Sequence, residues 1–175
     1  MRDGEEEAAM RLEELTDGTA SLWRSFMALP ETPVDARFYD VMRVGETAMA
    51  ADEGAALILS GAKTATSSLM EEFMPEIGPP PIGSYSIVLD GGGAAVCLVR
   101  TRALMLVRFC DCDEGLALAY GEWDGTLETW QRECGAYYAA RAAAFGLDWD
   151  ERRELVIEHF QVVHRAEWLV NPTAH

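Results

Sequence analysis

The sequence predicts an α+β fold, because segments with strand and helix patterns follow one another along a single chain. Residues 85–89 and 94–100 are typical of two strands, and the turn Asp90-Gly91-Gly92-Gly93 between them predicts a hairpin. Thr126 is a suitable cap for the longest helix, which is expected to continue to residue 145. Residues 155–165 have the pattern of a closing strand.

Shorter elements are expected between these. The pattern predicts helices over 52–60 and 114–120, and a strand that resumes over 104–109 after the hairpin. The prolines and glycines of residues 75–83 predict a loop with little freedom that leads into the hairpin.

The length and the charge of the chain limit its function. With 175 residues, nearly half of them hydrophobic, it is long enough for one domain with a substantial core. Its formal net charge of -16 argues against a broad surface for RNA or DNA, since phosphate contacts supply most non-specific affinity. A nucleoside, a base or another small molecule is therefore the favoured partner.

Residues 1–36 predict a helical extension to a domain over residues 37–175. Apolar residues recur at helical spacing from Leu12 to Met27, Asp17-Gly18 is a candidate break, and prolines follow at 30 and 33. The aromatic residues of this extension must cover apolar surface, either on their own domain or on a second chain. Packing on the same domain is favoured, and both a monomer and a homodimer remain open.

The four cysteines do not form a dense disulfide pattern, and the acidic start of the chain is unlike a secretion signal. No stretch is long and apolar enough to span a bilayer. We therefore expect a cytoplasmic protein with reduced thiols and no membrane partner. Cys110 and Cys112 would share a face of a strand and could meet one metal ion, but no second pair completes a zinc site. A structural role is favoured, and no metal is expected.

Lys63 is the only lysine of the chain, and it lies in the stretch Gly61-Ala62-Lys63-Thr64-Ala65-Thr66-Ser67-Ser68. Arginine stays charged at ordinary pH, whereas burial can shift the pKa of a lysine and let it exchange a proton. An amine beside a hydroxyl is one way to activate a nucleophile. The stretch also fits a solvated lysine followed by ordinary strand residues, so the residues alone leave both interpretations open.

Gly61 suits the left-handed position that ends a helix. In a regular strand, Lys63 and Thr66 would point to opposite faces, because side chains alternate with a period of two. The two side chains converge only if the chain turns between them, and a helix end at Gly61 predicts such an irregular stretch.

The order of the motifs resembles the ASCH domain family. Gly61-x-Lys63-Thr64-x-Thr66 is similar to the signature of that family. The other similar elements, in the family's order, are the hairpin over 83–92, the strand over 99–101, Gly121-Glu122-Trp123-Asp124, the helix with Leu127 and Trp130, and Phe160-Gln161-Val162-Val163. The resemblance spans residues 38–175 and implies a PUA-like fold, which is a small mixed β-barrel of about five or six strands flanked by helices.

Some bacterial single-domain members of this family remove an acyl group from N4-acylated cytidine. The resemblance implies a similar amidohydrolase here, with Lys63, Thr66 and Glu122 as catalytic residues. Thr66 would attack the amide carbonyl, Lys63 would take the threonine proton, and Glu122 would protonate the leaving amine or activate water. No metal or organic cofactor is required. Taken alone, Glu122 also fits a carboxylate that favours the start of the next helix.

Two positions depart from the family's pattern and leave the exact substrate open. Ser68 stands where characterised relatives often have an arginine, and Trp123 stands where many have a glycine. The candidates for substrate binding are Thr64, Ser68, Tyr120 and Trp123.

RNA binding is the alternative, because many PUA-like domains bind RNA without chemistry. Lys63 would then contact a phosphate, and Tyr120 or Trp123 would stack on a base. Ribonuclease activity, which is associated with some relatives, is a third interpretation. The acidic composition weighs against RNA binding.

Overall fold

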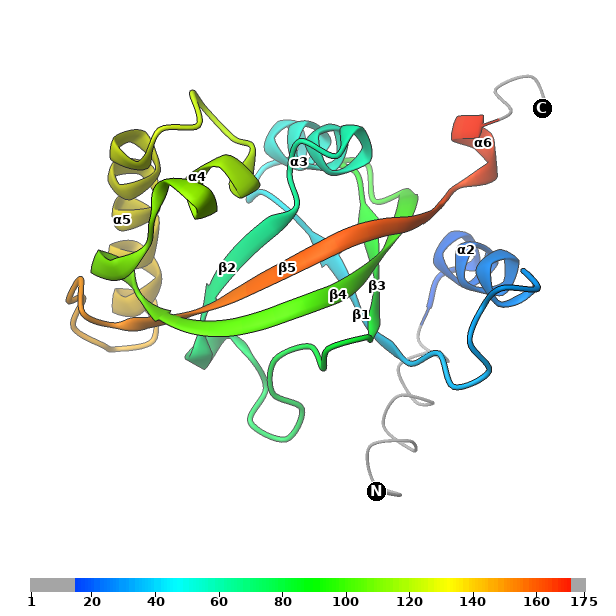
Figure 1. The fold of residues 1–175 in the computed structure, drawn as a ribbon, viewed down its shortest axis with the longest axis horizontal. Coiled ribbons are helices and arrows are strands. Elements are labelled where there is room, and N and C mark those ends of the chain that lie inside the picture. Colours follow the sequence, from blue (N-terminus) through cyan, green and yellow to red (C-terminus); the bar gives the residue numbers. More distant parts are fainter. Residues whose placement is uncertain (1–14, 171–175) are drawn as a thin grey trace.

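The computed structural model describes residues 15–170. One curved sheet runs through the molecule, with α4 and α5 at one end, α2 and α6 at the other, and α3 between them (Figure 1). In chain order the elements are α2 (Asp17–Met27), β1 (Phe38–Arg43), α3 (Ala48–Ser60), β2 (Ala65–Leu69), the 3-10 turn η1 (Met70–Glu72), β3 (Tyr85–Leu89), β4 (Ala95–Arg108), the 3-10 turn η2 (Phe109–Asp111), α4 (Glu114–Tyr120), α5 (Leu127–Ala144), β5 (Glu154–Arg165) and α6 (Glu167–Val170).

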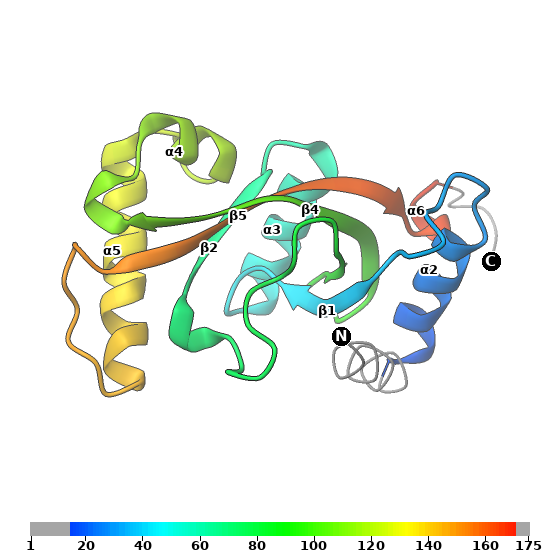
Figure 2. The ribbon, with the colours of Figure 1, turned by 60° about the horizontal axis from the view of Figure 1, so that its bottom comes forward.

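The sheet has five strands in the order β1-β3-β4-β5-β2. β1 pairs with β3 in parallel, whereas the other three pairs are antiparallel. β4 and β5 pair along most of their length, and their register shifts between Leu98 and Val99 and again between Thr101 and Ala103. Such bulges increase local twist and bend a strand. The result is a curled half-barrel (Figure 2), which confirms the predicted α+β class and the small curved barrel.

Three apolar clusters hold the helices on the sheet. α4 and α5 pack on β2 and β5 through a cluster that contains Trp130 and Tyr138. α3 packs on β3, β4 and β5 through Ile58, which lies in a second cluster with Val88 and Phe160. The helices therefore cover both faces of β5, since its odd-numbered and even-numbered residues enter different clusters.

Strand β2 lies at the edge of the sheet and alternates strictly. Ala65, Ser67 and Leu69 are buried, whereas Thr66 and Ser68 between them are partly exposed. Ala65 and Leu69 pack in the cluster with α4 and α5, whereas Thr66, Ser67 and Ser68 line a cavity. This short strand thus divides its side chains between core and cavity.

Helix α2 covers its own domain, as favoured from the sequence. Leu22, Trp23 and Phe26 are buried in a cluster with Phe38 and Tyr85 from β1 and β3. The ring centroids of Trp23 and Phe38 lie 5.6 Å apart in an edge-on arrangement, which aromatic pairs prefer. The part of the extension before residue 15, including Leu12, lies outside the described residues.

Several local expectations were wrong in detail. The candidate break at Asp17-Gly18 is instead the first turn of α2, capped by Thr16. The two expected strands over 94–100 and 104–109 are one continuous strand, β4. The expected helix over 52–60 begins earlier, after the cap residue Thr47. The sequence did not predict the strand β1. Only one of its six residues is buried, so its sequence has no clear alternation of apolar and polar residues.

Among the described residues, no helix combines the length and the apolarity that crossing a membrane requires.

Truncation of Trp23 should destabilise the protein. We expect Trp23→Ala to lower the free energy of unfolding by about 3–5 kcal/mol, because it leaves a cavity in a packed aromatic cluster. Urea denaturation followed by circular dichroism measures this. Arg24→Ala on the exposed side of the same helix should change the value by less than about 0.5 kcal/mol. Equal effects of the two substitutions would contradict the packing of α2 on the sheet.

Candidate active site

Lys63 lies in the irregular turn between α3 and β2. Gly61 ends α3 in the left-handed conformation, with φ 80°, which glycine adopts at little cost. The Lys63 N–H then donates to the carbonyl of Leu57 at 3.0 Å, and the Thr64 N–H donates to the carbonyl of Ala119 at 2.7 Å. Strand geometry begins only at Ala65. The helix end expected at Gly61 and the irregular stretch after it are present.

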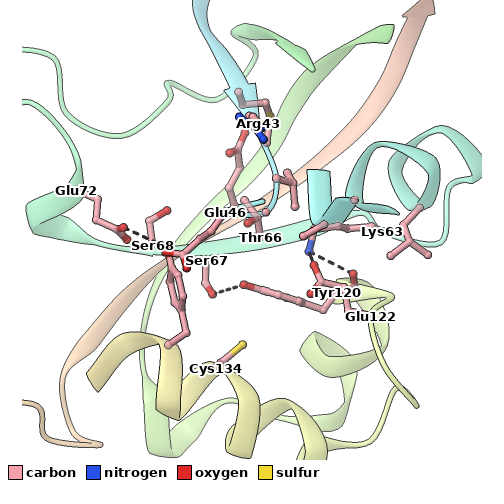
Figure 3. A pocket seen from close by; sticks show the side chains of 18 of the residues that line it. Arg43, Glu46, Lys63, Thr66, Ser67, Ser68, Glu72, Tyr120, Glu122 and Cys134 are labelled. Atoms are coloured by element: carbon pink, nitrogen blue, oxygen red, sulfur yellow. Dashed lines mark hydrogen bonds and ion pairs between the residues drawn. The ribbon is translucent and has the colours of Figure 1, made fainter. Parts of the chain in front are cut away.

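The ammonium group of Lys63 is fully buried and has three partners. Its Nζ lies 2.7 Å from Oε1 of Glu122 and donates to the carbonyl of Tyr120 at 3.3 Å. The same nitrogen lies 3.6 Å from the centre of the Tyr120 ring, within the range of a cation–π contact. Figure 3 shows the Lys63 and Glu122 side chains pointing toward one another. The interpretation of Lys63 as a solvated lysine is therefore wrong.

Burial lowers the pKa of Lys63, and the charge and hydrogen bond of Glu122 oppose that shift. Desolvation disfavours the charged form of an amine, whereas a nearby carboxylate favours it. Because desolvation is the larger effect, the neutral amine is easier to reach than for a solvated lysine. A neutral amine can accept a proton, which is what a general base requires.

Glu122 is held by a loop that begins at Gly121. Gly121 ends α4 with φ 68°, and a Cβ at this position would overlap the backbone of Ala62 and Lys63. Only glycine allows so close an approach of the two segments. Trp123 follows with φ 52°, and its ring stacks on Tyr120 with centroids 6.2 Å apart.

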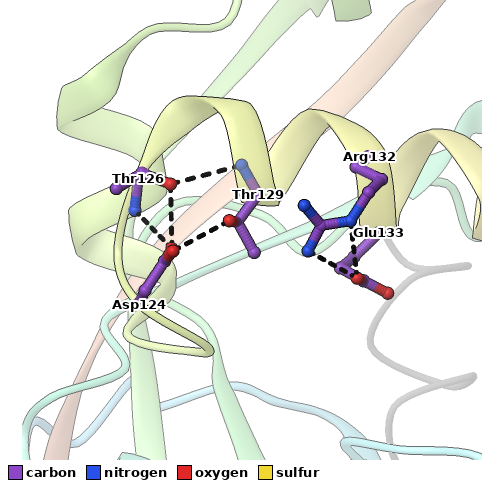
Figure 4. A network of polar contacts seen from close by, with 5 residues as sticks. All are labelled: Asp124, Thr126, Thr129, Arg132 and Glu133. Atoms are coloured by element: carbon purple, nitrogen blue, oxygen red, sulfur yellow. Dashed lines mark hydrogen bonds and ion pairs between the residues drawn. The ribbon is translucent and has the colours of Figure 1, made fainter.

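Asp124 fixes the other end of this loop (Figure 4). Its Oδ1 accepts hydrogen bonds from the N–H and the hydroxyl of Thr126 at 3.0 and 2.8 Å, and its Oδ2 accepts from the Thr129 hydroxyl at 2.9 Å. These bonds, those from Thr126 first, lower the pKa of Asp124 because they favour the carboxylate. The loop that carries Glu122 and Trp123 is thus tied to the start of α5.

A cavity of about 810 Å³ lies beside the Lys63–Glu122 pair. It is bounded by β1, β2, β3, β5, α3 and the segment from α4 into α5. The predicted site residues that line it are Lys63, Thr66, Ser68, Tyr120, Glu122 and Trp123. These residues come from two separate parts of the chain, residues 63–68 and 120–123, and Figure 3 shows most of them around one space.

Thr64 is the one candidate that does not line the cavity. Both its N–H and its hydroxyl lie within hydrogen-bonding distance of the Ala119 carbonyl, at 2.7 and 3.4 Å. Its side chain thus joins the start of β2 to the end of α4. Thr66, two residues later, lies within β2 and lines the cavity.

Behind β2, three hydroxyl groups form a buried network. The Ser67 hydroxyl lies 2.9 Å from the Tyr120 hydroxyl and 2.6 Å from the Tyr138 hydroxyl. Burial raises the pKa of both tyrosines, so both stay protonated at ordinary pH. The network fixes the Tyr120 ring, whose face and carbonyl contact Lys63.

Glu158 is a cavity residue that sequence reasoning missed. It lies near the centre of β5, is 9% exposed, and accepts a hydrogen bond from the Thr101 hydroxyl at 2.7 Å. Burial raises its pKa, and the Thr101 bond opposes the shift. The sequence did contain a signal for Glu158, because it is a carboxylate in a largely apolar strand, Leu155 to Phe160. Glutamate is rarely buried without a partner or a function, so its position there could have marked it as a site residue.

The pair Cys110 and Cys112 does not share the face of a strand. The chain forms the turn η2 there, so that Cys110 is exposed and Cys112 is buried. Burial raises the pKa of Cys112 to about 12, which disfavours the thiolate that a metal requires. Within residues 15–170, no group of three or more His, Cys, Asp or Glu side chains is arranged to hold a metal ion.

Comparisons with known proteins agree with this fold. The sequence model of the ASCH domain matches residues 40–164. An ASCH domain from Lactobacillus crispatus JV V101 has a similar crystal structure, with a TM-score of 0.81, 21% identity, and coverage of 89% of this chain and 99% of that one. A protein of Enterococcus faecalis V583 has a TM-score of 0.75, 25% identity, and coverage of 86% and 95%. No curated protein matches this sequence.

Replacement of the buried amine should leave the fold intact. We expect Lys63→Met to keep or raise the free energy of unfolding at neutral pH, by up to about 2 kcal/mol, because the remaining Glu122 is 25% exposed and can be solvated. The wild type should gain stability relative to the variant as pH rises toward about 10.4, since the unfolded lysine binds the proton more tightly. Urea denaturation of both proteins at several pH values measures the difference, and parallel pH profiles would contradict the lowered pKa.

Two glycines that end helices should respond differently to alanine. We expect Gly61→Ala to cost about 1–2 kcal/mol of stability, because the site is open and only the left-handed conformation is strained. Gly121→Ala should cost more and should also displace the Lys63 turn, since its Cβ would overlap the Ala62 backbone. Thermal unfolding of the two variants checks the order, and equal losses would contradict the close approach at Gly121.

Proposed function

This chain belongs to the ASCH domain family, and we propose that it is an amidohydrolase that removes the acyl group from N4-acylated cytidine or a related small nucleoside. The observation that carries the proposal is the buried Lys63, whose Nζ lies 2.7 Å from Glu122 and which lines the same cavity as Thr66. A base, its carboxylate partner and a hydroxyl nucleophile are the groups that acyl transfer needs.

The first half of the reaction transfers the acyl group to the protein. The Thr66 hydroxyl attacks the amide carbonyl carbon, and its proton passes to the neutral amine of Lys63. The resulting ammonium group is stabilised by Glu122 and by the Tyr120 carbonyl. When the tetrahedral intermediate collapses, the bond from carbon to N4 breaks, and N4 takes a proton from the Lys63–Glu122 pair. Cytidine leaves with a free amino group.

The second half restores the threonine. Water attacks the acyl ester on Thr66 and gives its proton to the Lys63–Glu122 pair. The ester bond then breaks, the carboxylic acid leaves, and the Thr66 oxygen recovers a proton. Trp123, which is 51% exposed at the edge of the cavity and stacked on Tyr120, offers an aromatic surface for a pyrimidine.

RNA binding is the alternative interpretation, and the lining of the cavity argues against it. Seven lining residues are Asp or Glu, whereas two are Lys or Arg. Phosphate groups would meet repulsion there, because nucleic-acid affinity depends on neutralising them with cations. An RNA partner should bind with a steep salt dependence, whereas turnover of an uncharged nucleoside should not change steeply with salt.

Hydrolysis of N4-acetylcytidine, followed by absorbance, tests the proposal. We expect turnover by the wild type, and a loss of about a thousand-fold or more in Lys63→Ala and in Thr66→Val, because each removes a group that acts in acyl transfer. Thr64→Val is the matched control: it should retain activity, since Thr64 does not line the cavity. Circular dichroism confirms folding.

The absence of turnover in the wild type, together with tight binding of RNA oligomers that weakens with salt, would contradict the amidohydrolase proposal. Unchanged turnover in Lys63→Ala would exclude the role given to the lysine.

A further inference from the structure

Glu158 is a buried carboxyl group that the proposed mechanism does not use. One of its oxygens accepts the Thr101 hydroxyl at 2.7 Å. No cation among residues 15–170 forms an ion pair with it. Burying a carboxylate is costly unless hydrogen bonds or charges compensate. Because Glu158 lines the cavity, its second oxygen has room for a partner that comes from outside the protein.

The position of Glu158 relative to Thr66 is fixed by strand pairing. The two residues are direct partners in the antiparallel pair of β2 and β5. Side chains of such partners lie on the same face of the sheet, with Cβ atoms about 4.5–5.5 Å apart. A group bonded to the carbon that Thr66 attacks therefore lies within reach of the Glu158 carboxyl. In an N4-acylated cytidine that group is the amide nitrogen with its one hydrogen.

The charge of the cavity favours a ligand that donates hydrogen bonds. An ionised carboxylate only accepts them, and carboxylates outnumber cations in the lining by seven to two. A phosphorylated ligand would add further negative charge next to Glu158. An uncharged N–H donor instead satisfies the open oxygen without that repulsion.

We propose that Glu158 binds the substrate by accepting a hydrogen bond from the nitrogen of the scissile amide. This inference rests on the proposed function and narrows its substrate class to unphosphorylated N-acyl amines that keep an N–H, which excludes O-acyl esters and N-alkylated amides. It also gives the site a preference between pyrimidines. Cytidine presents an amino group at this place, whereas uridine presents a carbonyl oxygen that the carboxylate repels.

Calorimetric binding of cytidine and uridine to the wild type and to Glu158→Gln tests the proposal without turnover. We expect the wild type to bind cytidine at least about ten-fold more tightly than uridine, as for a hydrogen bond to a charged group. Glu158→Gln should reduce this ratio by about ten-fold, because the glutamine amide can turn its N–H₂ group toward the uridine oxygen. Glu53→Gln removes a carboxylate from the exposed part of the same cavity and should leave the ratio unchanged.

A second probe needs no variant. N4,N4-dimethylcytidine has no N–H at this nitrogen, and the wild type should bind it at least about ten-fold more weakly than cytidine. Three results would overturn the role of Glu158. The wild type could bind cytidine and uridine equally, or bind neither. The ratio of the cytidine and uridine affinities could also stay unchanged in a folded Glu158→Gln. If the ratio changes as expected while N4-acetylcytidine stays intact, the recognition of an N–H donor by Glu158 stands and the amidohydrolase proposal fails.

Kinetic measurements can show the opposite case, in which the amidohydrolase proposal stands and the role of Glu158 fails. If the wild type hydrolyses N4-acetylcytidine, Glu158→Gln should raise KM more than it lowers kcat, because the bond to the nitrogen is made in the bound substrate. Turnover with an unchanged KM in Glu158→Gln would overturn the role of Glu158 and leave the proposed function standing.

Discussion

The desolvation of one ammonium group constrains much of this structure. Lys63 is buried between two segments that are far apart in sequence, and it needs Glu122 and the Tyr120 carbonyl to offset the loss of water. Both segments must therefore be held still. The Thr64–Ala119 hydrogen bond and the close approach at Gly121 join them directly. These contacts enclose the amine, and that burial lowers the pKa of Lys63.

The predictable parts of the site are those set by neighbouring residues. Gly61 predicts the helix end because a left-handed residue favours glycine, and Thr126 predicts a helix start because its hydroxyl caps an N–H group. The irregular stretch that carries Lys63 followed from the first of these. The family's motif order supplied Glu122, which as a single acidic residue had no local signal.

The parts that could not be predicted depend on pairing between distant strands. Glu158 faces the cavity because of the register of β5 against β2 and β4, and a shift of one residue would have turned it into the core. Cys110 and Cys112 looked like strand residues because they follow the strand pattern of residues 104–109, yet β4 ends at Arg108 and the chain turns there to enter α4. Such endpoints are decided by tertiary packing, which local patterns do not contain.

Side chains of β2 and β5 point alternately to the cavity and to the core, so substitutions that change the ligand can be separate from substitutions that change the stability of the fold. Thr66, Ser68 and Glu158 face the cavity, whereas Leu69 and Ile157 lie in the core with α4 and α5. Selection can replace the first set to suit a new ligand with little disturbance to the second, because neighbouring side chains point to opposite sides. One half-barrel can in this way serve different small molecules while its folding requirements stay the same.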